Sequence, residues 1–97
     1  MRLPKRIKIN GIWYRIRVVP DDQLSSNELG QTIKEQQLIK LSNGLKGDVL
    51  TQVLIHELFH ASNWELGETE VESISQDFCQ ILFDNQDVAR RFVRRKK

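Results

Sequence analysis

The first 46 residues alternate between apolar and polar positions in the way that β-strands do. Residues 6–19 read RIKINGIWYRIRVV, and the alternation is interrupted at Asn10-Gly11. Asn-Gly is the strongest short signal for a two-residue type I′ turn, because that turn needs positive φ at both central positions. The pattern therefore predicts a β-hairpin, with the ring of Tyr14 in the core.

A second pair of shorter strands is predicted between residues 30 and 41. Thr32-Ile33 and the run Gln37–Leu41 are rich in apolar residues, and the polar triplet 34–36 separates them. Residues 21–29 and 42–47 are polar and turn-like, so we expect loops there. The segment 37–41 is the expected sheet edge to which an extended peptide could add.

Helical spacing replaces the alternation after residue 47. Asp48 is a good N-cap for a helix to about Asn63, and apolar residues cover most of its circumference, so we expect it between the sheet and another helix. A second helix is predicted from about Thr69 to Phe83, and a short third helix follows Asp84-Asn85. The apolar stripe expected on the second helix is Val71, Ile74, Phe78 and Leu82.

Strands followed by helices are typical of the α+β class. We therefore predict one domain over residues 1–97, mainly β over 1–46 and mainly α over 47–97. In this arrangement a small antiparallel sheet packs on the central helix. The second helix and a short C-terminal helix follow.

The composition is that of an ordinary globular domain. Apolar residues make up 39% and charged residues 29% of the chain. No apolar run approaches the roughly 18 residues of a membrane helix, so we expect no membrane contact. The basic N-terminus is not followed by the apolar segment of a secretory signal, and the single cysteine cannot form an internal disulfide. We therefore expect a cytoplasmic location.

Charge is distributed unevenly along the chain. Residues 47–89 contain nine Asp or Glu and no Lys or Arg, and this acidic block, which holds both histidines, favours cationic ligands. The end of the chain is basic, and together with Arg2, Lys5, Arg6 and Lys8 it could form a patch that attracts nucleic acid. Because no reading helix or aromatic platform accompanies these charges, a solvated helix end is the favoured interpretation. The basic residues at the end of the chain are Arg90, Arg91, Arg94, Arg95, Lys96 and Lys97.

Both histidines of the chain lie in the sequence His56-Glu57-Leu58-Phe59-His60. Residues four apart share one face of a helix, so the two imidazoles can point at a common metal ion. The helix is apolar around them, and burying two polar rings without a shared partner is unfavourable. This HExxH arrangement predicts a zinc site, with Glu57 placed to act as general base on a water molecule.

A catalytic zinc site needs a third protein ligand, and no histidine remains. Cys79 is more consistent with a small buried side chain, which leaves the carboxylates Glu65, Glu68, Glu70, Glu72 and Asp77. Glu72 flanks the apolar stripe a full turn inside the second helix, so we favour it as the ligand. Its alternative role is in a capping box with Thr69, and Glu68 is the reserve ligand.

The stretches TQVLIHELFHASNWELG and TEVESISQDFCQILFDN resemble the small HExxH zinc metallopeptidases of phages and prophages. These are gluzincin-type enzymes, short relatives of the ImmA/IrrE-like and minigluzincin-like groups, and the similarity covers most of the chain. It implies a zincin-like fold, a zinc cofactor and a protein or peptide substrate in the host cytoplasm. Gluzincins carry the third ligand in a Glu-x-x-(Ala or Ser)-(Asp or Asn) pattern. Residues 72–75 match its first four positions, and Gln76 departs from the Asp or Asn of the last position.

The function expected from the sequence is zinc-dependent hydrolysis of a peptide bond. Zinc on His56, His60 and Glu72 would activate a water molecule, and Glu57 would take its proton. Two alternatives stay open. One is a catalytically silent zinc-binding protein that binds a partner, and the other is a nucleic-acid-associated protein with a basic tail.

Overall fold

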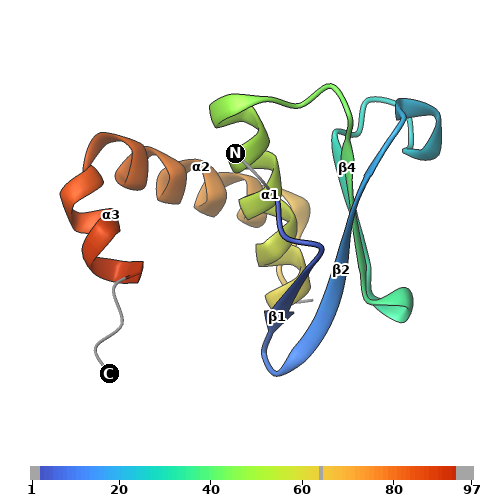
Figure 1. The fold of residues 1–97 in the computed structure, drawn as a ribbon, viewed down its shortest axis with the longest axis horizontal. Helices are drawn as coiled ribbons and strands as arrows, with labels where there is room; N and C mark the ends of the chain where they lie inside the picture. Colours follow the sequence, from blue (N-terminus) through green and yellow to red (C-terminus); the bar gives the residue numbers. More distant parts are fainter. Residues whose placement is uncertain (1–2, 64, 94–97) are drawn as a thin grey trace.

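The computed structural model describes residues 3–63 and 65–93 as a four-stranded sheet with three helices on one side of it (Figure 1). The strands are β1 (Arg6–Ile9), β2 (Ile12–Val19), β3 (Gly30–Ile33) and β4 (Leu38–Ser42), in the spatial order β1-β2-β4-β3. This confirms the predicted α+β class.

The predicted N-terminal hairpin is present. Asn10 and Gly11 both have positive φ, 50° and 82°, and Ile9 pairs with Ile12 across the turn. Tyr14 is only 3% exposed and lies in the core, as predicted. The core also contains Ile16, Ile39, Leu41 and Ala61.

The sheet is mixed, so the prediction of an antiparallel sheet is wrong for one pair of strands. β2 pairs with β4 in parallel, whereas β1 with β2 and β3 with β4 are antiparallel. Ile39 and Leu41 of β4 are completely buried, which favours a central position with a neighbour on each side. The connection over residues 20–29 leads from β2 to β3 at the far edge of the sheet, and β4 then returns to lie between them. The prediction that residues 37–41 form an edge of the sheet is therefore also wrong, because β4 is central and β3 is the edge strand beside it.

The central helix α1 (Gly47–Ser62) lies between the sheet and α2 (Glu68–Asp84), as predicted (Figure 1). Asp48 is not its N-cap. Lys46 holds that position, and Gly47 enters the helix with a φ of +58°, a conformation that glycine adopts without steric cost. Asp48 lies in the first turn, where its negative charge is favourable to the helix dipole.

The predicted apolar stripe of α2 is confirmed at Val71 but not at Ile74 and Phe78. Val71, Ser75 and Cys79 are buried, at 0%, 1% and 2% exposed, whereas Ile74 and Phe78 are 40% and 38% exposed. Because Ser75 and Cys79 are small, α2 can approach α1 closely along this face. Burial raises the pKa of the Cys79 thiol, which fits the small buried side chain predicted for it.

The third helix α3 (Gln86–Val93) follows directly after α2. Its Arg90 forms an ion pair with Asp87, and the basic residues Arg2, Arg94, Arg95, Lys96 and Lys97 lie outside the described residues. Within residues 3–63 and 65–93, none of the helices has both the length and the apolar character needed to cross a membrane.

We expect the core around β4 to carry most of the stability. Ile39→Ala should lower the free energy of unfolding by about 2–5 kcal/mol, because it leaves a cavity at a fully buried position. Ile81→Ala is the matched control on α2, where the side chain is 45% exposed. It should change stability by less than about 1 kcal/mol. Urea unfolding monitored by circular dichroism measures both, and equal losses would contradict this assignment of the core.

Candidate metal centre

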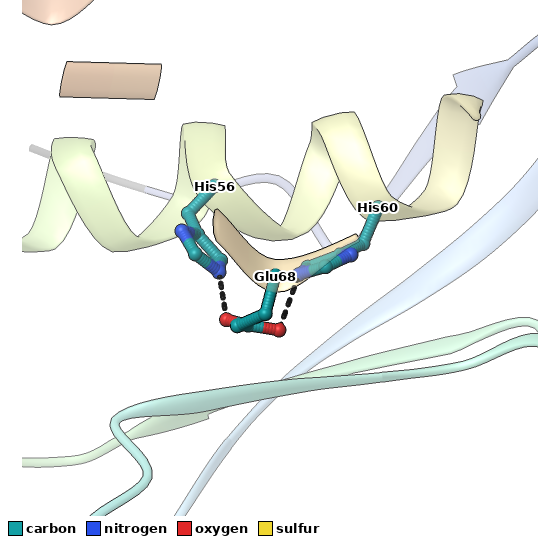
Figure 2. A group of neighbouring side chains, drawn as sticks. All are labelled: His56, His60 and Glu68. Carbon is teal, nitrogen blue, oxygen red and sulfur yellow. Dashed lines mark hydrogen bonds and ion pairs between the residues drawn. The ribbon is translucent and has the colours of Figure 1, made fainter. Parts of the chain in front are cut away.

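The two histidines come from successive turns of α1 and point to the same side of it (Figure 2). Their ring centroids are 4.8 Å apart, with an angle of 67° between the ring planes. The side chains of His56 and His60 are 13% and 19% exposed, so both rings are mostly shielded from water. The spacing of four residues places them together as predicted.

Glu68, the first residue of α2, lies between the two rings. Its Oε1 is 2.8 Å from His56 Nε2 and its Oε2 is 2.9 Å from His60 Nε2 (Figure 2). One nitrogen from each ring and one carboxylate oxygen lie within 4.8 Å of one another. Because bonds from zinc to such ligands are about 2.0–2.2 Å long, atoms this close can share one ion after small side-chain rotations. His56, His60 and Glu68 could therefore hold a metal.

Glu72 contacts the other nitrogen of His56. Its Oε2 is 3.1 Å from His56 Nδ1, and its Oε1 accepts a hydrogen bond of 2.6 Å from Gln76 Nε2. The structure thus brings Glu72 to one histidine and Glu68 to both. A carboxylate that accepts a hydrogen bond from the second ring N–H commonly orients a metal-binding histidine.

The chemistry of this donor set suits a cation. A neutral imidazole carries one proton, yet both nitrogens of His56 face a carboxylate oxygen at hydrogen-bonding distance. If Nδ1–H of His56 donates a hydrogen bond to Glu72, the lone pair on Nε2 faces an oxygen of Glu68, and a cation between these two atoms would be favourable. The residues therefore fit a zinc ion.

The helix cap leaves Glu72 free for this contact. α2 begins one residue earlier than predicted, and Glu70 Oε2 accepts a hydrogen bond of 3.1 Å from the backbone N–H of Gly67. Glu70 therefore performs the capping that the sequence suggested for Glu72 with Thr69. The capping role, which was the alternative to the favoured ligand role of Glu72, is therefore not found at Glu72.

Glu57 is buried, at 6% exposed, and lines the same pocket as the two histidines. The Thr32 hydroxyl on β3 donates a hydrogen bond of 2.7 Å to Glu57 Oε1. Burial raises the pKa of the Glu57 carboxyl, while this hydrogen bond and the nearby histidines oppose the rise. Nothing in the spacing of the sequence indicated Thr32, because its contact depends on the packing of β3 against α1.

Gly30 permits the close approach of β3 to α1. A Cβ atom at Gly30 would lie 3.0 Å from Val53 Cγ1 and 3.1 Å from both Cγ and Oε2 of Glu57. The strand and the helix border an open pocket of about 590 Å³. His56, His60 and Glu68, which we call the metal-binding group because they could hold an ion, are among the residues that line this pocket.

Comparison of the chain with models of known protein families, with curated proteins and with solved structures finds no match. The resemblance to phage metallopeptidases therefore stays a prediction. What the structure adds is local geometry. Cys79 and Tyr14 do not line the pocket, whereas Glu68 and Glu72 do.

Adding a methyl group at Gly30 should disturb Glu57. Gly30→Ala should lower the free energy of unfolding by about 1–3 kcal/mol, since Val53 and Glu57 must move to make room. Gly44→Ala is the control, because its added Cβ would meet only Ser42 Oγ, at an ordinary 3.8 Å. Thermal unfolding measures both variants. A destabilisation by Gly44→Ala as large as that by Gly30→Ala would show that close packing at Gly30 is not the cause.

Proposed function

We propose that this protein is a zinc-dependent hydrolase of peptide bonds. The observation that supports the proposal is the meeting of His56, His60 and Glu68 in one pocket with the buried carboxylate of Glu57. Two imidazoles and a carboxylate are the ligand set of many catalytic zinc sites. The acidic pocket also attracts a divalent cation.

The roles of the side chains follow from their contacts. When bound, zinc supplies a Lewis acid and a water molecule whose pKa falls towards about 7. Glu57 takes the proton of the attacking water and passes it to the leaving amine. Thr32 holds the Glu57 carboxylate by its 2.7 Å hydrogen bond. Glu72 orients His56 through Nδ1, and Gln76 in turn holds Glu72.

The third ligand in this proposal is Glu68 rather than Glu72. Glu68 is the carboxylate that contacts the Nε2 atoms of both histidines. Glu72 approaches the opposite nitrogen of His56, where it can orient the ring without touching the ion. The sequence alone favoured Glu72 as the third ligand with Glu68 as the reserve, and the proposal reverses that order.

A peptide substrate can bind along β3. This short strand is at the edge of the sheet, and residues Gly30–Thr32 line the pocket. An extended peptide can add to such an edge through backbone hydrogen bonds, which hold it independently of its side chains.

Metal binding tests the ligand assignment. The purified chain should bind one zinc ion, and His60→Ala should abolish tight binding because it removes one ligand. Glu68→Gln should weaken binding more than Glu72→Gln, for which we expect a loss of about 10–100-fold. Titration against a coloured zinc chelator at pH 7 measures the affinities.

Asp77→Asn is the matched control, since it removes an exposed carboxylate of the same helix that lies outside the metal-binding group. It should leave zinc affinity unchanged. A larger loss in Glu72→Gln than in Glu68→Gln would restore Glu72 as the third ligand. No zinc binding by the wild-type chain would refute the proposed function.

Catalysis is tested separately from metal binding. Glu57→Gln should keep the zinc ion and lower the rate of cleavage by about 10²–10⁴-fold, because it removes the general base. A library of quenched fluorescent peptides, digested by the zinc-loaded protein, measures cleavage. Glu65→Gln makes the same chemical change outside the metal-binding group and should leave the rate unchanged.

The alternative of a catalytically silent zinc protein gives a different result. In that case the wild-type chain binds zinc but cleaves no peptide of the library, and Glu57→Gln changes nothing. Zinc should still raise the melting temperature, because an ion that binds only the native state stabilises it.

A further inference from the structure

The outer face of the sheet, opposite the helices, carries basic side chains. All of them are exposed except Lys40, which is half-buried and donates a hydrogen bond of 3.4 Å from Nζ to the Gln23 carbonyl. Residues 13, 15 and 17 of β2 point to this face, because Tyr14 and Ile16 between them point into the core. The register places β1 residues Arg6 and Lys8 beside Arg15 and Trp13, and β4 residue Lys40 beside Arg17. Figure 1 shows the three helices on the other side of the strands. The basic sheet face is therefore defined as Arg6, Lys8, Trp13, Arg15, Arg17 and Lys40.

The charge of the basic sheet face is not neutralised. None of the four strands contains an Asp or Glu, and within the described residues no ion pair involves the five cations of this face. Arg6 and Arg15 stand directly opposite each other across β1 and β2. Like charges in that position are destabilising. A polyanion laid on this face would remove the repulsion.

Trp13 lies among these cations and is 45% exposed. The Arg6 guanidinium carbon is 4.1 Å from the centre of its ring, and Lys8 Nζ is 5.6 Å from a Trp13 ring centre. These contacts hold the indole in place on the sheet and keep positive charge beside it. A large flat ring left partly in solvent is available for stacking with another planar group.

We propose that the basic sheet face binds single-stranded nucleic acid. Its cations contact the phosphates, and a base stacks on Trp13. Basic residues with an exposed aromatic ring are the combination by which proteins hold single strands without strict sequence preference. A duplex keeps its base faces stacked inside, so it would offer no base face to Trp13. An acidic protein or an anionic membrane would use the charges but would not require the indole.

This surface is separate from the candidate metal centre. The opposite face of the sheet carries Tyr14, Ile16, Ile39 and Leu41, and α1 covers it. The two histidines belong to α1 and therefore lie on that side of the sheet. Binding of nucleic acid should therefore be the same with EDTA present and in the Glu57→Gln variant. Failure of the hydrolase proposal would leave this proposal unaffected, and the reverse also holds.

The test measures fluorescence anisotropy of labelled dT20 and U20 with the full chain. Affinity should fall as salt rises from 50 to 200 mM, with a logarithmic slope of up to about −3.5, that is roughly −0.7 for each of five cations. The double variant Arg15→Gln/Arg17→Gln should reduce this slope by about 1.4. Trp13→Leu should weaken binding by roughly 5- to 150-fold, and Trp13→Phe should retain most of the affinity because it keeps a stacking ring.

The matched control is the double variant Arg90→Gln/Arg91→Gln, which makes the same charge change on α3. We expect it to leave the affinity within about threefold of wild type. The proposal is overturned if this control weakens binding as much as the β2 variant does, or if Trp13→Leu binds as well as Trp13→Phe. Equal affinity for inorganic polyphosphate, or tighter binding to phosphatidylserine vesicles than to dT20, would also overturn it. Circular dichroism of each variant confirms that the fold is retained.

Discussion

The contact between α2 and α1 at Glu68 determines the arrangement of the candidate site. α1 supplies two imidazoles on one face, and the first residue of α2 places a carboxylate between them at 2.8 and 2.9 Å. The chain reaches this position through a short connection after Ser62, and Glu70 stabilises the start of α2 by capping Gly67. Further along α2, the small residues Ser75 and Cys79 allow the two helices to pack closely, so Glu72 also approaches His56.

The burial of Glu57 shows how the sheet takes part in the same site. Placing a carboxylate in an apolar helix is unfavourable unless a partner satisfies it. Thr32 provides that partner from β3, and Gly30 lets the strand come close enough to do so. A buried acid that opposes the local pattern is typical of a functional position rather than of a stabilising one. The edge strand β3 therefore both donates a hydrogen bond to the Glu57 carboxylate and lines the pocket.

Charge separates onto two sides of the sheet. The acidic block of residues 47–89 makes up most of the three helices and contributes carboxylates to the pocket. The strands carry cations and no acidic residue. The net charge of +2 conceals this division. Opposite potentials on two faces favour different ligands, a divalent cation on one and a polyanion on the other. The two proposals thus follow from one asymmetry of the fold.

Local signals in the sequence determined the hairpin at Asn10-Gly11, the order of strands and helices, and the pairing of His56 with His60. Each of these depends on neighbours within a few residues, through turn conformation or helical periodicity. Only the tertiary structure decided that β4 lies centrally and parallel to β2, and that Ser75 and Cys79 rather than Ile74 and Phe78 are the buried residues of α2. It also decided that Glu68 lies between the histidines and that Thr32 reaches Glu57. These contacts join segments whose relative position depends on the packing of the whole core, and spacing along the chain does not encode that packing.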